Sequence, residues 1–576
     1  MRRRGLSVIA AALLVGVAGC ANVPLETEPQ SIRPDAAVDN GSAEGAPPPA
    51  KDLPAADVVR AFVETSAQKA DSYSASRQYL SPAAAKSWQP TDEVQILDDD
   101  FNTIPAPRDE QPDNDNETVI TLVGEVVGQL HPDNSFTPLD KTLEKKLRLR
   151  RQPGTGEWRI IGLPDSVVTN ESEFGSYYFT TRLYFYAPNS NVLVPDLRYI
   201  AAQPAEGLAS RTIHALTEGP SYALRGAVDD PLSAASVETN VREVGSALEV
   251  PLTGLVGSSE ETRKQIVTQV VMSLENVELV RLLSEGKPLL PDRTDWRRGD
   301  LRAVAPEVAD SDGYAVLNGK LVSLASGSNV LGPAGSGAYQ VVSAAQSLEG
   351  GQLALVEDEG KTVRLRVGEL GKDAAPVSIR GKRMTRPTWQ PAYPGNKVSS
   401  EVWTVVDGRK VVRAQLTQDG AWVPRAVGTA AVRGFGAISA LRLSRDGTRA
   451  AMVADGKLVV AAVVRTPDSV ELRTPRILQP AMLADVKGVD WTSQQELVVA
   501  TESSSQPVVQ VSVDGFTTAA YSSSNLQQPI TGITALPSGR VLAADANGLW
   551  TVSSTNEPWD SQRNSQQGMT SPLYPG

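Results

Sequence analysis

The sequence predicts a multidomain fold in which two α+β domains are followed by an all-β propeller of about six blades. The chain has 576 residues, which is enough for several domains of about 150 residues each. Helical periodicity alternates with strand-like runs up to about residue 300 and is absent beyond it. From there a strand–turn–strand pattern recurs at spacings of 42, 54, 48 and 45 residues. Periods of this size are typical of four-stranded propeller blades.

Composition narrows the possible functions. Hydrophobic residues make up 41% and charged residues 21%, so each domain can bury an ordinary core. The net charge of -12 argues against nucleic acid as a partner, because phosphate binding needs a basic face. The single cysteine excludes disulfides within the chain and multi-cysteine zinc or iron–sulfur sites, and two histidines leave little material for metal ligation or for several acid–base roles. We therefore expect no metal and no cofactor.

Residues 1–19 have the pattern of a lipoprotein signal peptide. A charged stretch, residues 1–4, precedes an apolar run, residues 6–17, which is shorter than the ~20 residues of a membrane-spanning helix. The segment Val17-Ala18-Gly19-Cys20 follows and holds the sole cysteine of the chain. It is typical of a lipobox, in which the cysteine receives diacylglycerol before cleavage. We predict cleavage between Gly19 and Cys20, leaving Cys20 as an N-palmitoyl, S-diacylglycerol cysteine.

Two acyl chains suffice for stable anchoring, so we expect the protein on the extracytoplasmic face of the cell membrane. Ala21 follows the cysteine. An aspartate at this position would indicate retention at an inner membrane, and the sequence has none there. The alternative is an ordinary signal peptide with an incidental cysteine. Residues 20–51 are rich in Pro, Gly and Ala and hold few large apolar groups, which predicts a disordered tether.

Residues 52–170 are predicted to form an α+β domain. Asp52 is placed to cap a helix with Pro54 in its first turn. Its apolar face would hold Val58, Val59, Phe62, Val63 and Ala67. A second short helix is expected from Ser81-Pro82 to about Trp88, followed by strands at 94–97, 117–127, 143–151 and 157–163. Two helices ahead of a curved antiparallel sheet resemble the NTF2-like fold.

Residues 175–290 are predicted to form a second α+β domain. A strand at 181–186 precedes a helix at 204–218, which Gly219-Pro220 ends. Strands are expected at 237–241 and 248–252. Ser258 and Glu261 have capping-box spacing before a helix that would bury Ile266, Val267, Val270, Val271 and Leu274. The segments 183–186, 193–195 and 215–220, with the late amphipathic helix, resemble the GerMN domain.

Residues 300–576 are predicted to form the propeller. One copy of its repeat is residues 439–447, followed by a strand at 449–454. Other copies are centred on Ser347, Trp389, Trp491 and Leu536. At about 45 residues per blade the region holds about six blades. A strand at 320–325 is expected to close the ring against the last blade.

Few residues suggest chemistry. Asp113, Asp115 and Glu117 resemble the start of a calcium loop, but Thr118 and Gly124 stand where a glycine and a bidentate acid are needed. A solvated hairpin loop is the favoured interpretation, and residues 98–100 are interpreted as a turn. The basic run Lys145, Lys146, Arg148, Arg150 and Arg151 alternates with Leu147 and Leu149. It predicts a strand with one solvated face; the alternative is contact with anionic lipid or an acidic partner.

The sequence gives no positive case for catalysis, and we predict that the protein is not an enzyme. No G-x-S-x-G, Walker A or H-E-x-x-H motif occurs. His214 is expected at the boundary of a helix face and His131 in a turn before Pro132. A Ser-His-Asp site on either histidine, or a pair of carboxylates acting on a glycan, remains the alternative.

The whole arrangement resembles the LpqB lipoproteins of actinobacteria: lipobox, tether, NTF2-like part, GerMN domain and propeller. The resemblance implies an accessory protein of the MtrAB two-component system. It would contact the extracytoplasmic domain of the sensor kinase MtrB and modulate MtrAB signalling, with effects on cell-wall homeostasis and division. The resemblance supplies no catalytic residues, and only Cys20 is carried over as a functional position.

Two other functions remain open. The first is a lipoprotein that binds carbohydrate or peptidoglycan, for which exposed aromatic residues on the central face of the propeller would be evidence. The second is an enzyme acting on the cell wall, which needs paired acids or a nucleophile that converge in a pocket.

Overall fold

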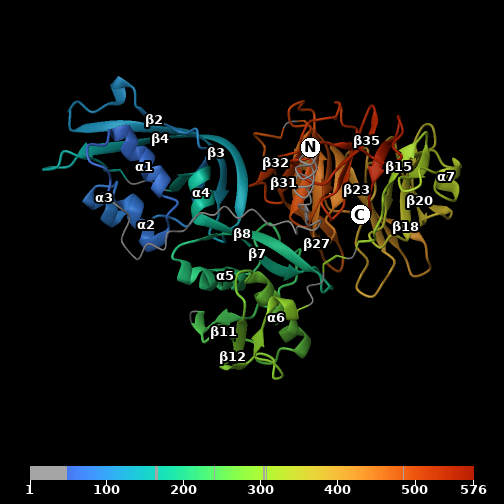
Figure 1. Ribbon diagram of the computed structural model, residues 1–576, viewed down its shortest axis with the longest axis horizontal. Coiled ribbons are helices and arrows are strands. Elements are labelled where there is room, and N and C mark those ends of the chain that lie inside the picture. Colours follow the sequence, from blue (N-terminus) through green and yellow to red (C-terminus); the bar gives the residue numbers. More distant parts are fainter. Residues whose placement is uncertain (1–47, 163–165, 239–240, 302–304, 307, 484) are drawn as a thin grey trace, which may run out of the picture. The chain divides into compact units, whose positions relative to one another are not determined.

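The computed structural model describes residues 48–576 apart from 163–165, 239–240, 302–304, 307 and 484 (Figure 1). The predicted signal peptide, Cys20 and most of the predicted tether lie outside these described residues. In the described part of the chain, no helix combines the length and apolar character needed to cross a membrane. Two α+β domains and an all-β propeller follow one another along the chain, which confirms the predicted fold class.

The first domain packs three helices against a curved sheet. The helices are α1 (Ala55–Thr65), α2 (Ala70–Arg77) and α3 (Pro82–Ser87). The sheet has the order β5-β4-β3-β1-β6, with β2 also paired to β3. Its strands are β1 (Val94–Leu97), β2 (Asn102–Pro105), β3 (Glu117–Leu130), β4 (Phe136–Arg151), β5 (Trp158–Ile160) and β6 (Val167–Asn170). The described pairs are antiparallel except β1 with β6, which run parallel.

The helices of this domain follow the sequence pattern except at two points. Helix α1 buries Val58, Val59, Phe62 and Val63 as expected, and Ser81 caps α3 by accepting a hydrogen bond from the Ala84 amide at 3.3 Å. Asp52 is not the cap of α1: the N-cap position is Pro54, and Asp52 lies earlier with φ 58°. Helix α2 is not predicted by the sequence, because it lacks an apolar stripe. Its first turn, Asp71 to Tyr73, has left-handed backbone angles.

Helix α4 (Glu171–Tyr177), whose Phe174 packs in the core of the first domain, leads into the second domain, which begins with the long hairpin of β7 (Tyr178–Tyr186) and β8 (Leu193–Ala201). A 3₁₀ turn (Ala205–Gly207) leads into α5 (Leu208–Thr217), whose C-cap Glu218 precedes Gly219 with φ 90°. A second sheet is centred on β11 (Ala247–Thr253) paired in parallel with β12 (Val280–Ser284). Helix α6 (Glu260–Ser273) buries Ile266, Val267, Val270 and Val271, and Leu274 beyond its end is buried too.

The edges of this second sheet are short strands. They are β9 (Ser236–Val237), β10 (Arg242–Val244), β13 (Lys287–Pro288) and β14 (Asp295–Trp296). Of the strand expected at 237–241, the described part includes Val237 in β9, which pairs with β11, and residues 239–240 lie outside the described residues. Strand β10 follows directly and pairs with β11 as well. A 3₁₀ turn (Arg298–Asp300) follows β14.

The N-terminal cap of α6 can be tested by replacing single serines. The capping residue is Ser259, whose hydroxyl accepts a hydrogen bond from the Thr262 amide at 3.1 Å, and not Ser258. We expect Ser259→Ala to lower the free energy of unfolding by about 1 kcal/mol, because one helix amide loses its partner. The matched variant Ser258→Ala should change it by less than about 0.5 kcal/mol. Urea unfolding measures both, and equal costs for the two variants would contradict the assignment.

The propeller has six sheets among the described residues (Figure 1). The first four-stranded blade holds β17 (Val341–Gln346), β18 (Gln352–Asp358), β19 (Val363–Glu369) and β20 (Ala374–Gly381). The second holds β21 (Thr388–Trp389), β22 (Glu401–Val406), β23 (Lys410–Leu416) and β24 (Trp422–Ala426). The third holds β25 (Ile438–Leu443), β26 (Arg449–Ala454), β27 (Lys457–Arg465) and β28 (Val470–Ile477).

The remaining blades complete the ring. The fourth holds β29 (Val486–Trp491), β30 (Glu496–Thr501), β31 (Val508–Ser512) and β32 (Thr518–Ala520). The fifth holds β33 (Gly532–Ala535), β34 (Val541–Asp545), β35 (Gly548–Val552) and β36 (Asp560–Ser561). The sixth combines β15 (Tyr314–Leu317), β16 (Lys320–Ser323) and β37 (Thr570–Leu573), and the short α7 (Pro333–Ser336) precedes the first blade.

The strand expected at 320–325 takes part in ring closure, because Val322 and Leu324 pack in one cluster with Leu542, Ala544 and Leu549 of the fifth blade. The strand that starts at Lys320, β16, pairs with β15 inside the sixth blade. Strand β37, from the far end of the propeller sequence, pairs with β15 and contacts both β33 and β17. The two ends of the propeller sequence are thus joined in one blade, which closes the ring.

The repeat centres have a common structural role. Trp389 and Trp491 end the innermost strands of their blades, and Ser347 and Leu536 follow theirs directly. The indole N–H of Trp389 donates to the carbonyl oxygen of Ala345 at 3.0 Å, and that of Trp491 donates to Arg442 at 3.1 Å. Each tryptophan is almost fully buried and ties its blade to the preceding one. The repeat therefore marks the contact between neighbouring blades.

Candidate functional site

Strand β8 lies where the three domains meet. Every residue of β8 is buried, although a two-stranded hairpin alone would leave half its side chains in solvent. Val194 packs with Ala462 and Val464 of the propeller, and Leu197 packs with Val453 and Leu458. Tyr199 belongs to the core of the first domain. We call this region the β8 junction, and define it as β8 with the side chains and loops that contact it.

A buried ion pair holds the middle of the β8 junction. Arg198 has no exposed surface and donates from Nη2 to Asp196 Oδ2 at 2.7 Å. It also donates from Nη1 to the carbonyl oxygen of Asp133, in the β3–β4 turn of the first domain, at 2.5 Å. The Asp196 carboxylate accepts further hydrogen bonds from the amide and hydroxyl of Ser221. The pair is thus fully hydrogen-bonded, as a buried pair must be to offset the cost of desolvation.

The propeller supplies the other side of the β8 junction. Arg449 Nη2 donates to the carbonyl oxygen of Pro195 at 2.5 Å, and Gln494 Nε2 donates to that of Leu193 at 2.8 Å. Tyr199 donates its hydroxyl to Asp514 Oδ2 at 2.7 Å. Burial raises the pKa of Tyr199 well above its ordinary value, so the hydroxyl stays protonated as a donor. These contacts join strands far apart in the sequence.

Phe516 extends the junction into the core of the first domain. Its ring makes edge-on contacts with Phe136 and Tyr199, both at 5.0 Å between centroids, and with Phe174 at 5.4 Å. Phe516 comes from the turn between β31 and β32 of the fourth blade. Such aromatic contacts add about 0.5–1.5 kcal/mol each beyond the burial of area.

Charged side chains also fill the centre of the propeller. Arg442 Nε donates to Asp490 Oδ1 at 3.2 Å, and Arg386 Nη2 lies 3.6 Å from Asp490 Oδ2. Thr534 donates its hydroxyl to Asp490 Oδ2 at 2.6 Å. Arg445 also acts on this carboxylate electrostatically. We call Arg386, Arg442, Arg445 and Asp490 the central charge cluster.

The central charge cluster shifts the pKa of its members. Burial raises the pKa of Asp490, but Arg442, Arg386 and Arg445 outweigh burial and lower the pKa to about 2. Burial and the neighbouring Arg442 lower the pKa of Arg386 to about 9. Asp490, Arg386 and Arg445 are therefore ionised at neutral pH.

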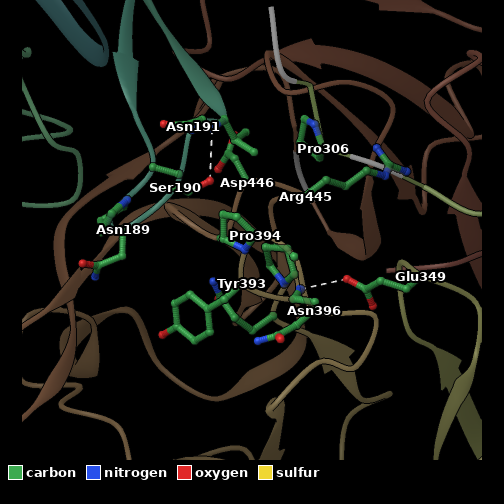
Figure 2. A pocket seen from close by; sticks show the side chains of 18 of the residues that line it. Asn189, Ser190, Asn191, Pro306, Glu349, Tyr393, Pro394, Asn396, Arg445 and Asp446 are labelled. Atoms are coloured by element: carbon green, nitrogen blue, oxygen red, sulfur yellow. Dashed lines mark hydrogen bonds between the residues drawn. The ribbon is translucent and has the colours of Figure 1, made fainter. Parts of the chain in front are cut away.

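A pocket of about 360 Å³ lies beside the central charge cluster (Figure 2). One part of its wall is the β7–β8 turn, with Asn189, Ser190 and Asn191. The other parts are loops that follow the innermost strands of the first three blades, and they contribute Glu349, Gln390, Tyr393, Asn396, Arg445 and Asp446. Figure 2 labels these side chains around the cavity, apart from Gln390. The pocket is thus built jointly by the second domain and the propeller.

The structure places the sequence-predicted candidates away from this pocket. His131 lies in the β3–β4 turn, with Nε2 3.0 Å from the Thr137 hydroxyl. His214 is on α5, its side chain is 75% exposed, and its Nε2 lies 3.2 Å from Glu218 Oε1. Neither lines the pocket. Within the described residues, no group of three or more His, Cys, Asp or Glu side chains is placed to hold a metal ion.

The acidic candidates have structural roles. Glu117 pairs with Arg148 at 2.9 Å and Arg150 at 2.6 Å, which supports the hairpin-loop interpretation over a calcium loop. Residues 98–100 include a turn. Asp99 accepts hydrogen bonds from Asn170 and from the amide and hydroxyl of Ser172 at the start of α4. Partial burial raises the pKa of Asp99, but these hydrogen bonds lower it below the ordinary value overall.

The basic run on β4 is a strand with one solvated face, as predicted. Leu147 and Leu149 are buried while Arg148 and Arg150 are exposed. Lys146 pairs with Glu110 at 2.7 Å, and Arg151 lies over the ring of Trp158. These neighbours favour the interpretation of a solvated strand over that of a surface for anionic lipid.

The sequence prediction missed the residues that form the pocket and the central charge cluster. Arg442 and Arg445 lie inside the quoted repeat copy at 439–447, which was interpreted only as strand and turn. Arg442 belongs to an innermost strand among apolar neighbours, and a charged residue there is a signal of a buried polar cluster. Asp490 stands at the same place in the next blade, one residue before Trp491.

Three family models match the chain over most of its described length. A model described as "Lipoprotein LpqB, N-terminal domain" matches residues 48–175, and one described as "Sporulation and spore germination" matches residues 182–290. A third, "Lipoprotein LpqB beta-propeller domain", matches residues 319–575. Their order agrees with the domain order expected from the resemblance.

Curated relatives extend over the whole chain. Lipoprotein LpqB of Rhodococcus opacus (strain B4) is 30% identical, covering 100% of this chain and 99% of that protein. Lipoprotein LpqB of Rhodococcus jostii (strain RHA1) is 30% identical with 100% and 98% covered. That of Mycolicibacterium smegmatis is 28% identical with 96% of each covered. Among solved structures, a chain of a nidogen/laminin complex is 10% identical, with a TM-score of 0.33 over 45% of this chain and 96% of that one.

Proposed function

Since the chain belongs to the LpqB lipoprotein family, whose members are lipid-anchored at the membrane, we propose that it binds the extracytoplasmic domain of the histidine kinase MtrB. Binding would modulate MtrAB signalling and, through it, cell-wall homeostasis and division. The lipid on Cys20 would hold the protein on the extracytoplasmic face. The proposed role is binding and not catalysis.

The β8 junction is the observation that supports this proposal most. Contacts of β8 with the first domain and the propeller make the domains one composite surface. A partner that contacts two domains at once would then bind a surface in which the domains already have fixed positions. Such preorganisation lowers the entropic cost of association.

The anchor and the surface together suggest how signalling would change. Anchoring confines the protein to the plane of the membrane and raises its effective concentration near a membrane-embedded kinase. Binding shifts the kinase only by the difference between its affinities for the two kinase states. We therefore expect different affinities for the active and inactive forms of the MtrB ectodomain, and equal affinities would remove this mechanism.

Crosslinking in native membranes tests the proposed partner. We expect the full-length lipoprotein to be crosslinked to the MtrB ectodomain, identified by mass spectrometry, with crosslinked lysines around the composite surface. The Cys20→Ala variant should leave the membrane fraction and lose the crosslink, because it lacks the acceptor for the lipid. Capture of wall polymers or their synthases without MtrB would contradict the proposal, as would an unchanged crosslink in the Cys20→Ala variant.

A further inference from the structure

Arg445 in the pocket has unused hydrogen-bonding capacity. It is 7% exposed, and its Nη2 donates to the carbonyl oxygen of Ala535 at 2.7 Å. Its Nε–H and Nη1–H groups have no partner among the described residues. Buried polar groups are almost always hydrogen-bonded, so unpartnered donors on the wall of a cavity point to a molecule that occupies it. Burial lowers the pKa of Arg445 to about 10, and the side chain stays positive at neutral pH.

Glu349 offers the complementary acceptor. Its Oε1 accepts a hydrogen bond from the Ala392 amide at 2.8 Å (Figure 2). Its Oε2 is buried and has no partner among the described residues. A ligand that satisfies Glu349 must donate an O–H or N–H. The pocket is therefore complementary to a molecule that has both an anionic group and hydrogen-bond donors.

The other charged groups of the pocket are already engaged. Asp446 accepts from the hydroxyls of Ser444 and Thr448 at Oδ1, and from Gln494 at Oδ2. Arg465 uses both terminal nitrogens on Glu401 and Gln390. Arg445 is thus the cation that retains a terminal N–H for a ligand among the described residues that line the cavity.

The remaining wall fits a small sugar. Tyr393 is 45% exposed and presents a flat apolar ring, against which the C–H face of a sugar ring can pack. Amide side chains of Asn189, Asn191 and Asn396 surround the cavity and are suited to hydroxyl and acetamido groups. A volume of about 360 Å³ is at the small end of ligand sites.

We propose that this pocket binds an acidic monosaccharide, with its carboxylate on Arg445 and its hydroxyl or amide N–H groups on Glu349. This proposal does not depend on the proposed contact with MtrB, and it would remain if that partner were wrong. The cavity between the β7–β8 turn and the propeller is thus assigned one class of ligand, an acidic monosaccharide.

A pair of probe sugars tests the carboxylate directly. N-acetylmuramic acid and N-acetylglucosamine share the ring and the acetamido group, and the former adds a lactyl carboxylate. Titration calorimetry on the full-length protein should show at least about tenfold tighter binding of N-acetylmuramic acid, because only its carboxylate can form a charge-assisted hydrogen bond with Arg445. Equal affinity for the two sugars, or no binding of either, would overturn the proposal.

Variants locate the site. Tyr393→Ala should weaken binding of both sugars, since the ring supports either. Asn396→Asp adds a negative charge at an exposed position of the wall and should weaken N-acetylmuramic acid more than N-acetylglucosamine. Arg445→Met should abolish the preference between them, and Asn396→Asp keeps the test valid if that buried substitution prevents folding. Tyr222→Ala, at a residue 67% exposed outside the pocket, is the control; a loss of binding there equal to that of Tyr393→Ala would refute the location.

Discussion

Replacing Asp490 by alanine is expected to destabilise the propeller by about 3–5 kcal/mol. Asp490 is 3% exposed and holds the only negative charge of the central charge cluster. Without it, Arg386, Arg442 and Arg445 are left as buried positive charges that repel one another. Removing one partner of a buried ion pair costs far more than the pair itself contributes, because the desolvated charge that remains has no compensation. Chemical unfolding of the full-length protein, monitored by tryptophan fluorescence, measures the loss.

The same carboxylate predicts how stability depends on acid. The arginines lower the folded-state pKa of Asp490 to about 2, below the ordinary value of about 3.9 for an unfolded chain. A group whose pKa is depressed on folding contributes stability above its unfolded pKa and loses it as pH falls through its folded pKa. We expect this contribution, about 2–3 kcal/mol, to be present above pH 4 and lost between about pH 4 and pH 2. The Asp490→Asn variant should lack this part of the acid dependence.

Two controls make the Asp490 result specific. Asp490→Asn keeps the size of the side chain and an acceptor for Thr534. The difference between the native protein and the asparagine variant therefore reports the charge, and the difference between the asparagine and alanine variants reports packing and the hydrogen bond. Asp468→Ala removes an exposed aspartate of the third blade and should cost less than about 0.5 kcal/mol. If Asp490→Ala cost no more than Asp468→Ala, the central charge cluster would not stabilise the propeller.

The sequence predicted the propeller because its repeat encodes contacts inside the fold. Trp389 and Trp491 recur at the same strand end because each packs against the preceding blade and donates to its backbone. Such a contact is local to two neighbouring repeats, so it leaves a periodic trace. The pairing of the closing strand β37 produces no such repeat, because its partner β15 lies more than 250 residues earlier. This pairing depends on closure of the whole ring and not on a contact between neighbouring repeats.

The candidate site could not be predicted in the same way. Arg445 and Glu349 lie in loops of different blades, and Asn189 belongs to another domain. Each is an ordinary polar loop residue in the sequence, and only the tertiary fold shows that they share a cavity. The complete burial of β8 is likewise a property of contact between domains, which no pattern within residues 193–201 indicates. The capping residue Ser259, one position from the expected Ser258, shows the limit of local patterns at helix ends.

Phe516→Ala is expected to uncouple the first domain from the propeller. The ring lies in a turn of the fourth blade but packs in the core of the first domain, where it contacts Phe136, Phe174 and Tyr199. Truncating a packed phenylalanine costs about 3–5 kcal/mol, and we expect about 3 kcal/mol because Phe516 is only partly buried. This loss falls on the contact between domains, so calorimetry should show the first domain unfolding in a separate transition below that of the propeller.

A phenylalanine of similar burial inside a single domain provides the comparison. Phe435 is partly buried against the core shared by the second and third blades, and it has no part in the β8 junction. Phe435→Ala should lower the unfolding temperature of the propeller without separating a transition for the first domain. Both variants replace a phenylalanine by alanine. A difference between their unfolding transitions therefore reflects the location of the ring, at the contact between domains or inside the propeller. If both gave one shared transition, Phe516 would act as an ordinary core residue, and the composite surface that the proposed MtrB contact needs would have to depend on Asp196, Arg198 and Arg449 instead.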